Sequence, residues 1–146
     1  MPGIVVGFDS SSDSRRALEW AMNEAAVRHA PLTVIAVHEI VTDYWGTGLV
    51  EPEDDAAAER TRLAVQAEVD KVLAGLGDGR PGWIGIQTPG GTPVAELLRE
   101  SQDADMLVVG SRGAGGFADL AMGSVSAKVI QHARCPVAVI PSENHR

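Results

Sequence analysis

Glycine and serine are concentrated between positions 110 and 126, near the C-terminal end of the chain. Glycine occupies positions 110, 113, 115, 116 and 123, and serine follows at 124 and 126. Glycine allows positive φ and close approach of the backbone to a ligand, and a helix start presents N–H groups with partial positive charge. Ser124 is placed to cap the following helix or to donate its hydroxyl to a phosphate oxygen. The stretch predicts a phosphate-binding loop rather than a plain connector, which needs fewer glycines.

The spacing of this loop differs from the widespread nucleotide-binding motifs. The chain has no G-x-x-x-x-G-K-[ST] sequence and no G-x-G-x-x-G after its first apolar run, so neither a P-loop NTPase nor an ordinary dinucleotide-binding domain is indicated. The histidines and the single Cys135 show no metal-ligand spacing. No side chain is evidently placed to orient an attacking water. We therefore expect a binding site without a catalytic set, and at most slow hydrolysis of a bound nucleotide.

Five short apolar runs alternate with longer amphipathic stretches around this loop. The runs at 4–6, 32–37, 83–87, 106–109 and 137–140 are typical of strands, and those between them are typical of helices. The order βαβαβαβαβ predicts an α/β fold, an open and mostly parallel five-stranded sheet with helices on both faces. The weakly alternating run at 83–87 is expected near a sheet edge.

Local signals place the helix ends within this pattern. The cluster at 10–13 offers several N-caps for a helix ending near residues 30–31, and a second helix is expected at 54–76. Thr92 and Pro93 predict the start of a third, with Val94, Leu97 and Leu98 as its buried face. The last helix is expected at 124–133, and residues 40–52 are expected to form a long loop. All of this fits one domain, residues 1–146.

Composition narrows the classes of partner. The formal net charge of −8 argues against a general affinity for nucleic acids or anionic membranes, which need clustered Lys and Arg. The chain has no uninterrupted apolar run of about 18 residues or more. Its opening residues do not resemble a signal peptide, and Cys135 has no intrachain partner. We expect a reduced, cytoplasmic compartment.

The glycine loop has the spacing G-x2-G-x9-G-[ST], with Gly110, Gly113, Gly123 and Ser124 in the four places. In this spacing the chain resembles the universal stress protein family, specifically its ATP-binding branch. The opening residues 4–11 look like that family's Val-Gly-x-Asp-Gly-Ser, and the segments 91–93, 105–110 and 135–141 also look familial. The resemblance implies a Rossmann-like fold of the adenine nucleotide alpha hydrolase type, with strand order 3-2-1-4-5. The ligand crevice is then expected where the first and fourth strands lie side by side.

The resemblance also implies a role for each matching position. Asp9 and the backbone of Gly7 would contact the adenosine part, and backbone groups near His38 and Glu39 would face adenine. The remaining positions would border ribose and phosphates or hold the phosphate tail: Gly110, Arg112, Gly113, Gly116, Gly123, Ser124, Val125 and Ser126. Mg²⁺ would arrive with the phosphates of ATP. One departure is Ser10, where the family often has glycine.

The resemblance implies an ATP-binding regulatory or stress-response protein that forms a homodimer. The apolar last strand, with Val137 and Val139, would pair with its twin at the sheet edge. Two alternatives stay open at this stage. One is a dimeric interaction or chaperone-like protein that does not use nucleotide, and the other is a hydrolase or nucleotidyl transferase on a related scaffold.

Overall fold

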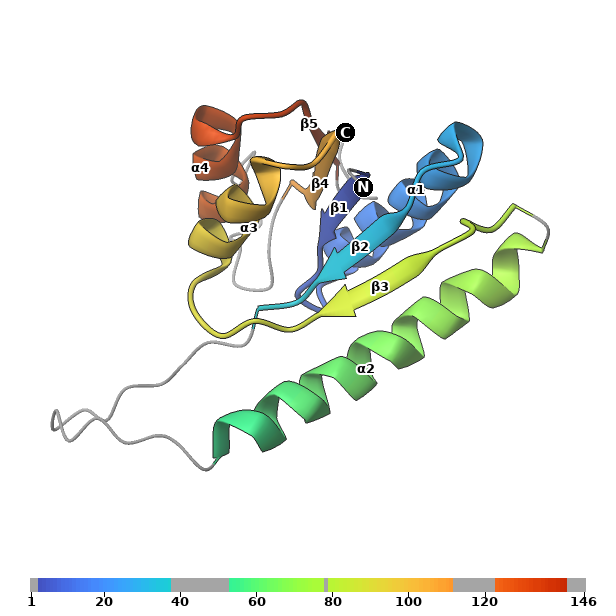
Figure 1. Ribbon diagram of the computed structural model, residues 1–146, viewed down its shortest axis with the longest axis horizontal. Coiled ribbons are helices and arrows are strands. Elements are labelled where there is room, and N and C mark those ends of the chain that lie inside the picture. The colour runs from blue at the N-terminus through green and yellow to red at the C-terminus, as the bar shows by residue number, and fades with distance from the viewer. Residues whose placement is uncertain (1–2, 38–52, 78, 112–122, 142–146) are drawn as a thin grey trace, which may run out of the picture.

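The computed structural model describes residues 3–37, 53–77, 79–111 and 123–141. Strands and helices alternate along this part of the chain, as the apolar pattern predicts (Figure 1). In order they are β1 (Ile4–Gly7), α1 (Ser12–Arg28), β2 (Leu32–Ile35), α2 (Glu53–Leu76), β3 (Ile84–Gln87), α3 (Pro93–Ser101), β4 (Met106–Gly110), α4 (Ser124–His132) and β5 (Val137–Ile140).

The five strands form one parallel sheet in the order β3-β2-β1-β4-β5. This confirms the predicted fold class and strand order. Strand β1 is central, with Val5 opposite Thr33 of β2 and Leu107 of β4. The chain leaves β1 toward β2 on one side and later returns to β4 on the other. The carboxyl ends of β1 and β4 therefore flank the point where the connections diverge, which is where open α/β sheets bind ligands.

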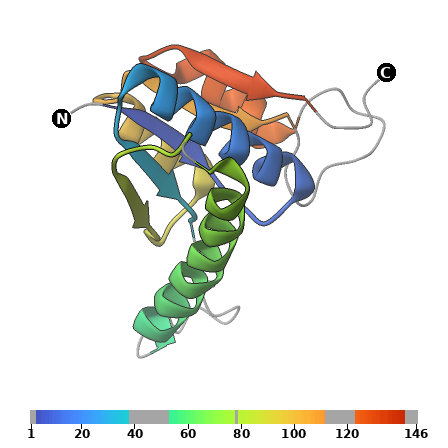
Figure 2. The same cartoon turned by 90° about the vertical axis from the view of Figure 1, so that its right-hand side faces the viewer.

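Alternate residues of the strands face two separate cores, one on each side of the sheet. Ile4 and Val6 of β1 pack with the apolar residues of α1 and α2, whereas Val5 packs with those of α3 and α4. Figures 1 and 2 show these two helix pairs on opposite faces. Leu18 and Met22 of α1 are fully buried, and each such side chain contributes about 1.5–3 kcal/mol to stability. Both sheet faces are thereby covered, which explains why β1 and β4 are apolar without alternation.

The helix boundaries follow from capping residues. Ser11 caps α1, because its hydroxyl accepts the N–H of Ser14, and α1 ends at His29 with φ of 55°. Thr92 caps α3 and Pro93 is its first residue, as predicted. The buried face of α3 differs in part from the prediction. Leu97 is buried, but Val94 and Leu98 are only half-buried, whereas Glu96 is buried.

Glu96 is tolerated in that position because it has a charged partner. Its carboxylate pairs with both terminal nitrogens of the Arg99 guanidinium at 3.0 Å. The carboxylate also lies over Gly91, where an added Cβ would be 3.2 Å from Glu96 Oε2. Gly91 has φ of 136°, so the turn before α3 requires glycine for its backbone conformation.

Strands β3 and β5 form the two edges of the sheet. The edge position expected for residues 83–87 is confirmed, although the strand begins at Ile84 rather than Trp83. Strand β5 is half-buried along its whole length and pairs with β4. None of the described helices combines the length and hydropathy needed to cross a membrane.

Candidate functional site

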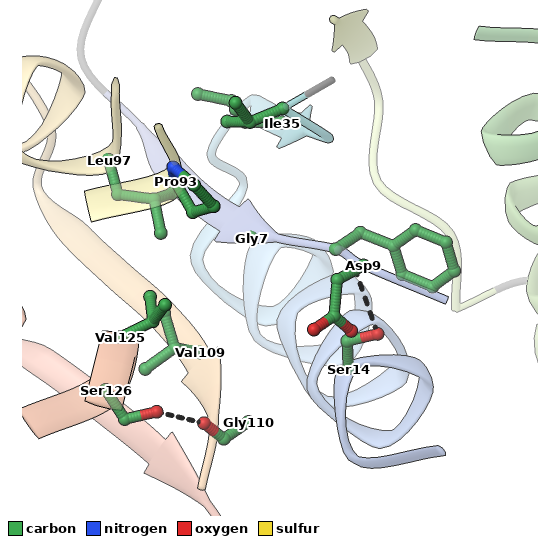
Figure 3. Close-up of a pocket in the computed structure, with 12 residues that line it drawn as sticks. Gly7, Asp9, Ser14, Ile35, Pro93, Leu97, Val109, Gly110, Val125 and Ser126 are labelled. Carbon is green, nitrogen blue, oxygen red and sulfur yellow. Dashed lines mark hydrogen bonds between the residues drawn. The ribbon is translucent and has the colours of Figure 1, made fainter. Parts of the chain in front are cut away.

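A cleft lies at the carboxyl ends of β1, β2 and β4, between α1, α3 and α4 (Figure 3). Its lining residues come from all of these elements. They are Gly7, Phe8, Asp9, Ser14, Ile35, Val37, Pro93, Leu97, Val109, Gly110, Val125 and Ser126. A mostly apolar cleft with a few polar groups is typical of small-molecule sites.

One side of the cleft is an apolar wall. Ile35 is the last residue of β2 and Val37 follows the strand, and Pro93 and Leu97 project from the first turns of α3 (Figure 3). Gly7 lies between these residues and has no side chain that would occupy the cleft. A Cβ at position 7 would lie 3.2 Å from both Leu97 methyl carbons, which is tighter than ordinary van der Waals contact. This wall can accept a flat apolar group.

The turn between β1 and α1 forms a polar rim. Asp9 Oδ1 accepts the N–H of Ser11 at 3.0 Å, and the Asp9 N–H donates to Ser14 Oγ at 3.2 Å (Figure 3). Ser10 between them has φ of 69°. Asp9 is exposed, and these bonds hold it at the mouth of the cleft. The helix cap itself is Ser11, so Asp9 shapes the turn rather than capping α1.

The start of α4 forms another part of the cleft lining. Its N-cap is Gly123, which provides no side-chain hydrogen bond, and Ser124, Val125 and Ser126 form the first turn. The first N–H groups of an α-helix lack intrahelical acceptors and carry partial positive charge. Val125 and Ser126 line the cleft directly. Of the lining residues within the described ranges, none is Lys or Arg, so among these residues the groups that can donate to an anion are backbone N–H groups and serine hydroxyls.

The first turn of α4 is bonded to the end of β4 at two points. Ser126 Oγ donates to the Gly110 carbonyl at 2.6 Å, and the Gly123 N–H donates to the Ser111 carbonyl at 2.7 Å. Ser126 is buried, so its hydroxyl serves this contact. The orientation of the helix start relative to the cleft is therefore set by residues 110 and 111.

A family model for the universal stress protein family matches residues 2–141. The chain belongs to the universal stress protein family. A universal stress protein of Mycobacterium tuberculosis is 33% identical over 97% of this chain, and the match covers 48% of the relative. The chain thus spans about half the length of the curated relatives that it matches.

Solved universal stress proteins share the fold. The Lactobacillus plantarum protein UspA superimposes with a TM-score of 0.76 at 25% identity, covering 95% of this chain and 97% of that one. A universal stress protein from Archaeoglobus fulgidus, solved in complex with dAMP, gives a TM-score of 0.60 at 25% identity, with 96% and 97% covered.

The universal stress protein motif residues that the structure describes converge on the cleft. The cleft is lined by five of them, Gly7, Asp9, Gly110, Val125 and Ser126. Two more lie at the start of α4, where Gly123 is the N-cap and Ser124 is the first helical residue. His38, Glu39, Arg112, Gly113 and Gly116 lie outside the described residues. The ligand roles of all twelve positions remain predictions.

One of the two roles expected for Ser124 is wrong, and so is positive φ at the two glycines of this loop that the structure describes. Ser124 does not cap α4, because the chain is already helical there and Gly123 is the N-cap. Gly110 and Gly123 do not use positive φ; in the described ranges the glycines that do are Gly77 and Gly91, and Gly123 has φ of −78°. Gly110 is glycine because α1 packs on it. An added Cβ would lie 2.8–2.9 Å from the Asp13 backbone carbonyl and Cβ atoms.

Sequence reasoning missed several residues of the site. Ser14, Pro93 and Leu97 line the cleft, but in the sequence they appear as ordinary helix-start and core residues. Asp13 and Ser111 are buried and bonded to each other although 98 positions separate them. A buried Asp–Ser pair leaves no periodic signal, so only the strand order could have brought the two together.

Proposed function

We propose that this domain, residues 1–146, binds an adenine nucleotide, ATP with Mg²⁺ carried by its phosphates. The base would lie on the apolar wall of Ile35, Val37 and Leu97, and the phosphates would approach the start of α4. The observation that carries the proposal is the N-terminus of α4, whose N-cap Gly123 provides no side-chain hydrogen bond, in the lining of a mostly apolar cleft. The dAMP complex of the Archaeoglobus relative supports an adenine nucleotide in this family.

We further propose that nucleotide binding regulates interactions and that hydrolysis is at most slow. No group of three or more His, Cys, Asp or Glu side chains that could hold a metal ion occurs among the described residues, so the proposed Mg²⁺ would depend on the phosphates. The proposed assembly is a cytoplasmic homodimer through the half-buried edge strand β5, with Val137 and Val139 at the contact. The net charge of −8 supports a function without nucleic-acid or membrane partners.

Proline at position 124 tests the phosphate site without removing the helix. Gly123 has φ of −78° and ψ of 164°, the extended conformation that proline requires of its predecessor, and proline suits the first helical position. Ser124→Pro removes one N–H aimed at the phosphates. A hydrogen bond to a charged group contributes about 1.5–3 kcal/mol, so ATP affinity should fall about 10- to 150-fold. Calorimetric titration with ATP and magnesium measures this loss.

The matched control is Ser124→Ala, which keeps the N–H and removes only an exposed hydroxyl. Because the Ser124 hydroxyl can donate to a phosphate oxygen, we expect an ATP affinity between those of the wild-type protein and the proline variant. Absence of any ATP binding by the wild-type protein would reject the function, and equal affinity of the proline and alanine variants would reject the helix N-terminus as the phosphate site. A dimer that binds no nucleotide would instead favour the interaction protein kept as the alternative.

A further inference from the structure

Ser111 connects three elements that the chain brings together only in the folded state. Its hydroxyl donates to Asp13 Oδ2 of α1 at 3.1 Å, and its carbonyl accepts the N–H of Gly123, the N-cap of α4. Its own N–H donates to the Ile140 carbonyl of β5 at 2.9 Å. Both Ser111 and Asp13 are buried, at 8% and 5% exposure. Every polar group of Ser111 is thus bonded within the protein.

The contact between α1 and the end of β4 is also close in space. The backbone of Asp13 lies against Gly110, with no room for a Cβ between them. The carbonyls of Gly110 and Ser111 in turn accept the two hydrogen bonds from Ser126 and Gly123 that hold the first turn of α4. The direction of the α4 N–H groups therefore depends on two consecutive peptide groups, and Asp13 fixes the second of these through the Ser111 hydroxyl.

We propose that Ser111 is a positioning residue for phosphate recognition, oriented by Asp13. This inference rests on the proposed nucleotide-binding function. Hydrogen bonds weaken steeply when donor and acceptor are misaligned, and a displacement of about 1 Å at a binding site is enough to lose much of the interaction. Without its hydroxyl bond the Ser111 peptide can tilt, and the N–H groups at the start of α4 tilt with it. Ser111 itself is absent from the cleft lining, so it acts through α4 rather than on the ligand.

Ser111→Ala tests the inference by comparing ATP with adenosine. The hydroxyl bond joins Ser111 to Asp13, and neither residue belongs to the cleft lining or to the apolar wall formed by Ile35, Val37 and Leu97. We expect about a 10-fold loss of ATP affinity, the effect of misaligning one hydrogen bond to a charged group, with adenosine affinity unchanged within two-fold. Isothermal titration of both ligands and urea unfolding of each variant give the comparison.

Ser101→Ala is the matched control for the loss of a buried hydroxyl. Ser101 is 1% exposed at the far end of α3, donates to the Leu98 carbonyl and accepts the N–H of Arg134. It should lower stability about as much as Ser111→Ala without changing ATP affinity. Two results with Ser111→Ala would overturn the positioning role: an equal loss of affinity for ATP and for adenosine, or an ATP affinity equal to that of the wild type. Neither result would argue against the nucleotide site itself.

A second pair of variants covers the case in which Ser111→Ala does not fold. Asp13→Asn keeps an oxygen acceptor for the Ser111 hydroxyl, whereas Asp13→Ala removes it. The expected result is ATP affinity close to wild type for the asparagine variant and about 10-fold weaker for the alanine variant. Indistinguishable ATP affinities of the two would also overturn the inference. A wild-type protein that binds neither ligand would reject the proposed function itself, and the inference with it.

Discussion

Replacing Ser10 by glycine should stabilise the protein although it removes a side chain. Ser10 has φ of 69° in the turn between β1 and α1, which is a left-handed conformation. Within the described ranges, Ser10 and His29 are the two non-glycine residues that adopt it. The conformation costs an L-residue about 1–2 kcal/mol. Glycine avoids this cost but loses about 0.5–1 kcal/mol more entropy on folding. Since the Ser10 side chain is exposed, these two ranges give a net gain of about 0–1.5 kcal/mol.

Urea unfolding followed by circular dichroism measures this gain as a higher midpoint with an unchanged m-value. The matched control is Ser12→Gly, two positions further, because Ser12 is exposed at the first position of α1 and is helical. The same chemical change should destabilise there, by up to about 1 kcal/mol. If Ser10→Gly lowered the midpoint as much as Ser12→Gly does, the backbone strain at position 10 would be refuted. ATP affinity should not change in either variant, since neither residue lines the cleft.

Three further substitutions test the cleft, the proposed dimer and the cysteine. Gly7→Val should weaken both adenosine and ATP binding at least about 10-fold in calorimetry. The reason is that the valine Cβ would be only 3.2 Å from the Leu97 methyl carbons and the valine methyls would fill the cleft. Adenosine and ATP affinities equal to those of the wild type would contradict the proposed cleft. Val139→Asp should give monomers in light scattering, since it places a charge on edge strand β5, and a dimer of unchanged affinity would exclude that interface. Burial, together with the Asp105 charge, raises the pKa of the Cys135 thiol. Alkylation of Cys135 by iodoacetamide should therefore reach its half-maximal rate at a higher pH than alkylation of a free cysteine. Asp105→Asn should lower the pH of half-maximal rate. If the wild-type protein gave the same pH profile as glutathione, the effects of burial and of the Asp105 charge would both be contradicted.

The order of helices and strands could be predicted because it depends on local physics. Periodic apolar residues such as Ala17, Leu18, Ala21 and Met22 define the buried face of α1, and Thr92 with Pro93 sets the start of α3. Continuous apolar runs indicate strands buried on both faces, as β1 and β4 are. These patterns depend on residues that are close in sequence, so they can be interpreted without knowing which other segments of the chain pack against them. The strand order itself came from the family resemblance rather than from these patterns.

The glycine pattern located the site but not the reason for each glycine. Gly110 does not have the positive φ expected for glycines of this loop, and it makes room for the first turn of α1 while also lining the cleft. Gly7 was expected to contribute backbone contacts, and the structure adds that it leaves space beside Leu97. Side-chain volumes at a contact depend on what packs there, and the packing partner lies far away in the sequence.

The sequence by itself determined that this chain forms an alternating α/β fold with a glycine-rich connection before its last helix. Only the tertiary structure decided that Asp13 meets Ser111, that Glu96 is buried against Arg99, and that α3 contributes to the cleft wall. The physical reason is the range of the interactions. Propensity, capping and periodicity depend on neighbouring residues, whereas a buried hydrogen bond between residues 98 positions apart exists only after the parallel sheet has placed their strands and helices side by side.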